Sequence, residues 1–384
     1  MKRKIVSLLL SLALITGVLA GCGGSGGSDA NTASSSGDGL KIAIVTSLSG
    51  VDDGSFNQDN YNGIQDFIKD HEGAQVTPVL EKTGDPAACI KAVEEIVADY
   101  DVIVCDGFQF AGIVTVAEDN PDKYFLLVDT FPADAEGNAV EVENINAMTY
   151  KEGEGGFLAG LAAALSSQTK KVAIVNGIAY PTNVSYQYGF MSGVNYANKH
   201  YNTGVEIVEL PSYAGTDVTG AKVGGNYVGS FSDEANGKIV GEALIKKGCD
   251  VIYVAAGASG NGVFTAVKES KAKDFVIGCD TDQYDLGVNG NENIVLTSAL
   301  KCMRMNDKRV LESIADGSFK GGNYLLGVDT DSVSYVSEEG RCQIDAGTKE
   351  KIDKAYQLIK DGKIIPADSS NGMTPDNFTG IDAE

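Results

Sequence analysis

A regular alternation of short apolar runs with longer segments of helical periodicity is the feature that most constrains this chain. The runs are rich in β-branched residues and have the length of strands buried on both faces of a sheet. The segments between them place apolar residues on one helical face, as Tyr61, Ile64 and Phe67 do within residues 57–71. Strands that alternate with helices form βαβ units and a parallel sheet. The chain is therefore predicted to be an α/β protein.

The predicted elements fall into two successive series. Strands are expected in the first series at 41–47, 75–80, 101–105, 124–128 and 145–148, and in the second at 171–176, 206–210, 251–255, 275–279 and 294–298. Helices are expected to begin at Asp85-Pro86 and to occupy 57–71, 152–167, 188–200, 233–247, 262–270, 306–316 and 349–361. Two series favour two doubly wound parallel-sheet lobes over one large sheet. Because parallel sheets bind ligands at the carboxyl ends of their strands, two facing lobes would form a cleft.

The N-terminal residues have the pattern of an export signal. Lys2, Arg3 and Lys4 precede an apolar run over 5–20 that is too short for a convincing membrane span. The run ends in Leu-Ala-Gly-Cys at Cys22, which resembles a bacterial lipobox. The resemblance implies that residues 1–21 are a lipoprotein signal peptide and that Cys22 is lipidated after cleavage. An ordinary secretory signal with an incidental cysteine is the alternative.

Residues 22–39 are expected to be a flexible tether behind this anchor. Residues 23–39 contain no large apolar side chain, so burial cannot offset the entropy of ordering them. A lipid-anchored domain on such a tether would work on the extracytoplasmic face of a bacterial cell membrane. The short basic start and the long tether fit a Gram-positive cell.

Composition excludes several classes of function. The 53 acidic residues outnumber 30 basic ones, and the formal net charge of −23 argues against a nucleic-acid-binding surface. The two histidines argue against histidine-based catalysis or a multi-histidine metal site. Of the seven cysteines, the six beyond Cys22 show no metal-ligand spacing. We expect them to be mostly free, buried thiols, with a disulfide framework as the alternative. No metal or cofactor is expected.

Two phenylalanines follow polar loops and open helices, one in each series. Phe56 lies in DDGSFNQ after the first strand, with Asn57 beside it, and Phe231 lies in YVGSFSD before the helix at 233. Each ring could offer its π-face to a planar ligand, and two such rings could hold a ring system between them. Packing of either ring into the core is an equally good explanation of each motif alone.

Charged residues also stand at predicted strand ends. Asp129 ends YFLLV and Asp280 ends FVIGC, where a carboxylate in a cleft could accept two hydrogen bonds from a vicinal diol. Lys301 follows the run 294–300 and could donate to a ligand oxygen. For each of the three, a turn, cap or solvated charge is the favoured alternative when it is taken alone. Small residues around Gly257, in AAGASGNGV, would let the backbone approach a ligand.

Six segments together resemble the basic membrane protein family of bacterial substrate-binding lipoproteins, which includes purine nucleoside receptors of ABC importers. The resemblance covers residues 41–364. It depends on DGSFNQ at 53–58, KEGEGGFLAGLAAAL at 151–165, YVGSFSD at 227–233, AAGASGNGVF at 255–264, IGCDTDQ at 277–283 and LTSALK at 296–301.

The resemblance implies a fold similar to type I periplasmic binding proteins, with a hinge of crossing strands and a ligand enclosed between two lobes. Lobe 1 would comprise 40–149 and about 302–322, and lobe 2 would comprise 150–301 and about 323–384. Phe56 and Phe231 would stack on a base, and Asn57 would bind its edge. The groups that would hold the ribose are Asp129, Asp280, Lys301 and the backbone near Gly257.

One position departs from the pattern of nucleoside-binding relatives. Those relatives usually carry an aspartate where this chain has Ser47, and a hydroxyl is a weaker partner for ring N–H groups than a carboxylate. The resemblance still implies a monomeric binding protein without catalytic activity. Its partners would be a nucleoside-like small molecule, an ABC permease with its ATPase, and the membrane, with no nucleic acid. The alternatives are a nucleoside-processing enzyme, a receptor for a flavin-like ring, and a surface sensor.

Overall fold

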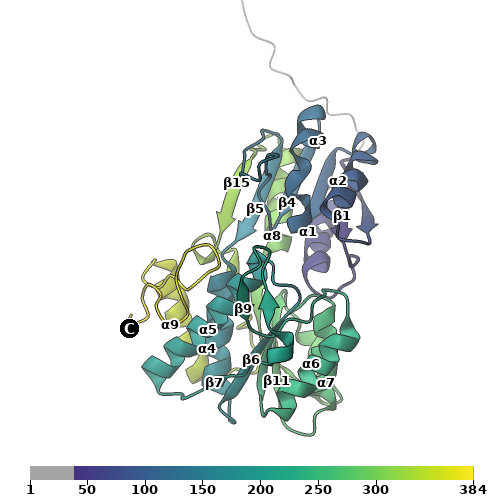
Figure 1. Cartoon of the computed structure of the whole chain (residues 1–384). Helices are drawn as coiled ribbons and strands as arrows, with labels where there is room; N and C mark the ends of the chain where they lie inside the picture. The colour runs from purple at the N-terminus through teal and green to yellow at the C-terminus, as the bar shows by residue number, and fades with distance from the viewer. Residues whose placement is uncertain (1–38, 384) are drawn as a thin grey trace, which may run out of the picture. The chain divides into compact units, whose positions relative to one another are not determined.

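Two six-stranded sheets form the framework of the protein. A computed structural model describes residues 39–383 (Figure 1), so the predicted signal peptide 1–21, Cys22 and nearly all of the tether lie outside the described residues. In the first sheet every pair is parallel, and the strand order is β15 (Gly322–Leu326), β5 (Ile145–Tyr150), β4 (Tyr124–Val128), β3 (Val102–Asp106), β1 (Lys41–Ser47) and β2 (Gln75–Glu81).

The second sheet is parallel except at one edge, where β16 runs antiparallel to β14. Its order is β16 (Val333–Tyr335), β14 (Val295–Lys301), β11 (Phe275–Asp280), β10 (Val251–Ala255), β6 (Lys171–Asn176) and β7 (Glu206–Ile207). Two short antiparallel ribbons lie outside both sheets, β8 (Gly215–Thr216) with β9 (Lys222–Gly224) and β12 (Val288–Asn289) with β13 (Glu292–Asn293).

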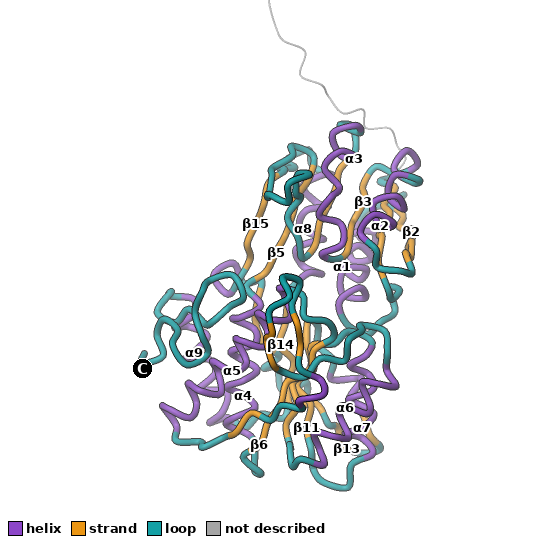
Figure 2. Tube along the Cα trace, viewed as in Figure 1, coloured by secondary structure: helices purple, strands orange, loops and turns teal. Residues whose placement is uncertain are grey.

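Helices cover both faces of each sheet (Figure 2), because the buried strands alternate apolar side chains between two cores. On the first sheet, α1 (Phe56–Asp70) and α8 (Met303–Ala315) cover one face, and α2 (Pro86–Glu94) and α3 (Val114–Asp119) cover the other. On the second sheet, α4 (Glu152–Ser166) and α5 (Pro181–Tyr201) oppose α6 (Glu234–Lys246) and α7 (Ser259–Glu269). Helix α9 (Ala346–Lys360) packs against α4.

The chain crosses between the two lobes at the ends of strands. It enters the second lobe between β5 and α4, returns between β14 and α8, and leaves the first lobe again after β15. These crossings form the hinge. Because β15 pairs with β5, the first sheet extends to Leu326, a few residues past position 322, near which the second segment of lobe 1 was expected to end.

Helices α4 and α5 cross with their backbones in contact, and glycines make this approach possible. A Cβ atom added at Gly160 would lie 2.1 Å from the carbonyl oxygen of Phe190, and one added at Gly193 would lie 2.1 Å from that of Phe157. Gly160→Ala is therefore expected to lower the free energy of unfolding by about 1–3 kcal/mol, measured by urea denaturation. Gly112→Ala is the control, because its nearest neighbour would lie 3.9 Å away and its φ is −77°. Equal stability of the two variants would contradict the close crossing.

Most predicted elements are present within three residues of their expected bounds, and some of the departures have local causes. Helix α5 begins at Pro181, seven residues before the predicted 188, because proline suits the first helical turn. Strand β7 ends at Ile207 rather than 210, and a 3₁₀ turn begins at Pro211. Strands β15 and β16 were not predicted from the sequence. They are edge strands, and Leu325 in β15 is 55% exposed, so a buried apolar run does not mark them.

The described cysteines are all free thiols, as predicted. Cys89, Cys105, Cys249 and Cys279 are buried, whereas Cys302 and Cys342 are only partly buried. A search for membrane-spanning helices among residues 39–383 finds none of sufficient length and hydrophobicity.

Candidate functional site

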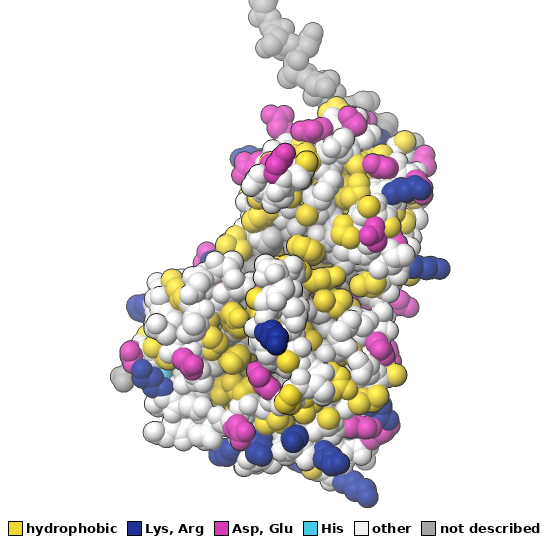
Figure 3. Space-filling view, in the orientation of Figure 1, with side chains coloured by type: hydrophobic (Ala, Val, Ile, Leu, Met, Phe, Trp, Pro, Cys, Tyr) yellow, Lys and Arg dark blue, Asp and Glu magenta, His cyan; other side chains and the backbone are white. Residues whose placement is uncertain are grey.

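A cavity lies where the carboxyl ends of the two sheets face each other. It encloses about 720 Å³, including the part that opens to solvent. In Figure 3, hydrophobic side chains gather at the level where the lobes meet. All the residues predicted to contact a ligand line this cavity: Ser47, Phe56, Asn57, Asp129, Phe231, Gly257, Asp280 and Lys301. The structure thus brings together residues that are up to 254 positions apart in numbering, although it does not test their role in binding.

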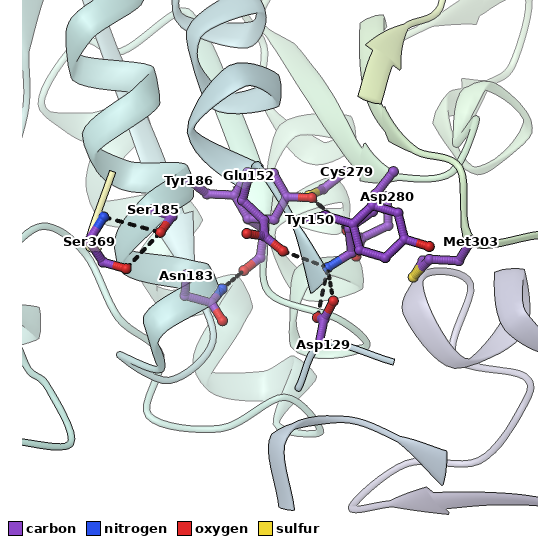
Figure 4. Close-up of polar contacts among 12 residues, drawn as sticks. Asp129, Tyr150, Glu152, Asn183, Ser185, Tyr186, Cys279, Asp280, Met303 and Ser369 are labelled. Atoms are coloured by element: carbon purple, nitrogen blue, oxygen red, sulfur yellow. Dashed lines mark hydrogen bonds and ion pairs between the residues drawn. The ribbon is translucent and has the colours of Figure 1, made fainter. Parts of the chain in front are cut away.

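Lys301 joins the lobes at the floor of the cavity. Its ammonium donates to both carboxylate oxygens of Asp129 at 2.7 Å and to Glu152 Oε1 at 3.3 Å. In Figure 4, dashed lines join Asp129 and Glu152 to the same nitrogen atom. Lys301 is only 2% exposed, so the alternative of a solvated strand-end charge is wrong. The ion pair of Lys301 with Asp129 links the end of β14 in the second lobe to the end of β4 in the first. Glu152 is the first residue of α4, where the chain passes from the first lobe to the second.

Burial and the neighbouring charges have opposite effects on the pKa values of Lys301, Glu152 and Asp129. Burial alone would lower the pKa of Lys301. The nearby acidic groups of Asp129, Glu152 and Asp280 raise the pKa by a larger amount, so it lies above its ordinary value and the ammonium stays charged. Burial raises the pKa of Glu152 to about 8 even though Lys301 lowers it. The pKa of Asp129 is also raised by burial, with Lys301 opposing. At neutral pH one ammonium therefore faces one carboxylate and one carboxyl group that largely keeps its proton.

Aromatic rings surround the same ammonium. The ring centroids of Phe56, Tyr150 and Tyr186 lie 5.2, 5.3 and 5.8 Å from Lys301 Nζ. Rings at this distance attract a cation through their electron-rich faces. Phe56 is also partly buried against the core. The ring is therefore held at the cavity by packing on one side and by the cation on another.

Asp280 also connects the lobes, at the end of strand β11, which pairs with the strand that carries Lys301. Its carboxylate accepts from Tyr186 Oη at 2.9 Å and from Ser55 Oγ of the first lobe at 3.2 Å. A second bridge runs close by, where Gln283 Nε2 donates to the carbonyl oxygen of Gly54 at 2.8 Å. A carboxylate can accept about four hydrogen bonds, so Asp280 retains room for a ligand hydroxyl.

Both strand-end aspartates have left-handed backbones. The φ of Asp129 is 66° and that of Asp280 is 69°. Aspartate tolerates this conformation better than most residues, but it remains a strained one that concentrates at functional sites. The turn lets each carboxylate leave the strand alternation and line the cavity. Gly257, with φ 53°, lies just after strand β10, and a Cβ there would lie 3.3 Å from the carbonyl oxygen of Phe231.

The loop between β1 and α1 is held by its own side chains. Asp53 accepts from the backbone N–H groups of Ser55, Asn57 and Gln58 at 2.9, 3.1 and 3.0 Å, so it caps α1 in place of Ser55. Asn57 Nδ2 donates to the carbonyl oxygen and the hydroxyl of Ser49, both at 3.0 Å. The amide donors of Asn57 are therefore occupied by the loop, and its oxygen is the atom left for a ligand.

Phe231 lies on the wall formed by the second lobe. A Cβ added at Gly177 would lie 2.3 Å from its ring, so the ring rests on bare backbone. Tyr180 packs beside it at 5.9 Å, and Phe108 of the first lobe packs on Tyr180 at 5.4 Å, with distances between ring centroids. Phe56 and Phe231 are each only partly buried, so neither ring lies in the interior of its own lobe. That they face each other across a ligand remains a prediction.

Several residues of the cavity were not recognised from the sequence. Asp106 ends an apolar strand just as Asp129 and Asp280 do, so the same signal would have found it. Phe108 and Tyr180 had no signal beyond being aromatic residues in loops. The other polar or aromatic lining residues that were missed are Ser49, Asp53, Gln109, Thr182, Asn183 and Tyr186.

Comparison with known proteins identifies the family. The model of the Bmp family, described as ABC transporter substrate-binding protein PnrA-like, matches residues 41–369. A Lactococcus lactis protein named ABC transporter nucleoside-binding protein BmpA is 28% identical over 95% of this chain and 99% of its own length. A Listeria monocytogenes protein named CD4+ T-cell-stimulating antigen is 29% identical over 95% of this chain and 98% of its own.

Solved structures share the architecture. An ABC transporter solute-binding protein from Aeropyrum pernix superposes with a TM-score of 0.71 at 22% identity, covering 87% of this chain and 94% of that one. At this identity the likeness shows the fold alone, and it confirms the predicted α/β, type I periplasmic-binding-protein-like class. Taken with the family match over most of its length, these observations show that the chain belongs to the Bmp family of PnrA-like ABC transporter substrate-binding proteins.

Proposed function

We propose that the protein captures a nucleoside, with a purine nucleoside favoured, and delivers it to an ABC permease and its ATPase for import. The observation that carries this proposal is the convergence of two phenylalanines, two strand-end aspartates and a buried lysine on one cavity between the lobes. The name of the Lactococcus relative supports the same ligand class. A ligand that contacts both lobes favours the closed form, which is the form a permease can distinguish.

Each half of a nucleoside finds a matching part of the cavity. Asp129, Asp280 and Lys301 offer charged partners for ribose hydroxyls, and such hydrogen bonds contribute about 1.5–3 kcal/mol each. Phe56 and Phe231 offer ring faces for the base, each worth about 1–3 kcal/mol. The carboxylates around Lys301 disfavour a phosphate group, so nucleotides are expected to bind more weakly than nucleosides.

The position of the protein in the cell follows the same proposal. Substrate-binding proteins of ABC transporters are extracytoplasmic, and we infer a monomer held at the outer face of the membrane by lipid on Cys22. Mass spectrometry of the protein extracted from membranes would detect the lipid. An unmodified Cys22 in the mature chain would contradict the anchor.

Isothermal calorimetry on a protein that begins at residue 39 tests the ligand class. We expect heat of binding with inosine, guanosine or adenosine, and less or none with uridine, riboflavin or inosine monophosphate. No heat with any nucleoside would contradict the proposal. Release of free base during incubation would instead favour a nucleoside-processing enzyme.

The two phenylalanines are expected to contribute comparably to affinity. Phe56→Ala and Phe231→Ala should each raise the dissociation constant by about tenfold or more, which corresponds to the loss of one stacking contact. Phe319→Ala is the control, because Phe319 is also partly buried and packs on Tyr124 outside the cavity. Unchanged affinity in both cavity variants would exclude the stacked arrangement.

A further inference from the structure

The carboxyl group of Asp106 has no hydrogen-bond partner among residues 39–383. Both of its oxygens are buried without a hydrogen bond, and the residue is 2% exposed, yet it lines the cavity. Leaving a buried polar group unpaired costs about 1–3 kcal/mol, and more for a charged one. Buried polar groups in native proteins are nearly always satisfied. An unpaired carboxyl group at the edge of a ligand cavity therefore indicates that its hydrogen-bond partner belongs to the ligand.

The sheet places this carboxyl group on the side of the cavity where a ring would lie. Asp106 ends β3, which pairs with β4 on one side and with β1 on the other. Neighbouring strands are about 4.8 Å apart, so Asp106 lies one strand beyond Asp129 toward Ser47. Val102 and Val104 face the core beneath α1 and α8, and strand alternation puts Asp106 on that same face. Phe56 begins α1 there.

No cation within the described residues is available to Asp106. Lys301 is bonded to Asp129 and Glu152. The charged groups that act on Asp106 are Asp307 of α8, Asp53 of the loop before α1, and Asp129 of β4, all of them acidic. Burial and these neighbours raise the pKa of Asp106 well above its usual range. A ligand that donates hydrogen bonds would supply the partner that the carboxyl oxygens of Asp106 lack.

We propose that Asp106 contacts the ligand and determines specificity: it releases its proton to solvent when the ligand binds, and its carboxylate accepts N–H groups from the edge of the ring system that Phe56 holds. The inference rests on the proposed function and adds to it the class of ring: one whose edge carries an N–H donor. The neighbouring polar groups do not supply this acceptor as well. The Asn57 amide oxygen and the Ser47 hydroxyl are both uncharged, so each is a weaker acceptor than a carboxylate.

The test compares two ligands and two buried aspartates. Inosine carries an N1–H group on its ring, and purine riboside has the same skeleton without it. We expect the wild-type protein to prefer inosine, and Asp106→Asn to reduce that preference by about tenfold or more, measured by calorimetry. The asparagine keeps the shape of the side chain but presents an NH₂ group or a weaker acceptor. Asp106→Ala should act in the same direction if the asparagine variant folds poorly.

Asp307→Asn is the matched control. Asp307 is 0% exposed, and both of its carboxyl oxygens are also unpartnered, but it does not line the cavity. Asp307 acts on Asp106 through charge and not through a hydrogen bond, so its replacement should change the inosine preference far less than Asp106→Asn does. A wild-type preference that persists in Asp106→Asn would overturn the assignment of Asp106 while leaving the proposed function intact. Absence of binding by the wild-type protein to either nucleoside would instead contradict the proposed function.

Discussion

Replacing Lys301 by methionine is expected to lower the free energy of unfolding by about 3–5 kcal/mol and to abolish measurable nucleoside binding. Methionine keeps the length of the side chain but removes the charge from a site that is 2% exposed. The carboxyl groups of Asp129 and Glu152 would then lose their only described cation. Breaking a buried ion pair is costly because the remaining charge is buried and uncompensated.

Urea denaturation at pH 7.5 and at pH 5 measures this effect. The loss should be smaller at pH 5, because a carboxyl group without a cation can take up a proton instead. Lys349→Met is the control. Lys349 lies 2.7 Å from Asp353 in an exposed i,i+4 pair, and such pairs contribute about 0.3–0.5 kcal/mol. Stability of Lys301→Met equal to that of Lys349→Met would mean that the cluster does not support the fold.

The stability of the ligand-free protein is expected to fall as the pH rises from 5 to 8. Burial raises the pKa of Asp59 to about 6, of Glu154 to about 7 and of Glu152 to about 8, and it raises the pKa of Asp106 and Asp307 well above the usual range. The unfolded chain loses these protons near pH 4, whereas the folded protein retains them. The folded state therefore binds more protons in this range, and stability decreases with pH by about 1.4 kcal/mol per unit for each such group.

Melting temperatures at four pH values between 5 and 8 would show this slope. Asp307→Asn should flatten it, because one retained proton is removed from the balance, and should raise the melting temperature at pH 8. Asp316→Asn should leave the slope unchanged, since Asp316 is exposed and its pKa is lowered by hydrogen bonds from Ser318. A melting temperature that increases steadily from pH 5 to pH 8 would show that the buried acids are ionised in the folded protein.

The pattern of the sequence predicts the strands and helices well where the elements are buried and regular. Strands β4, β6 and β10 have the predicted bounds, since four or five consecutive apolar residues leave little choice of structure. Strand ends also mark candidate ligand contacts, because parallel strands present their carboxyl ends at one edge of the sheet. Asp106 fits the same rule, since VIVCD has the same form as FVIGCD.

What the sequence determined by itself is local: alternating strands and helices, the loops that follow the strands, and the polar and aromatic residues in those loops. These features depend on residues close together in the chain, so periodicity reveals them. Only the tertiary structure decided which groups became partners. Lys301 meets Asp129 and Glu152 across 172 and 149 positions, whereas Asp106 meets no partner among the described residues. Pairing between residues so far apart in the chain depends on how the two sheets and the segments that connect the lobes pack together. Local sequence patterns do not predict this packing.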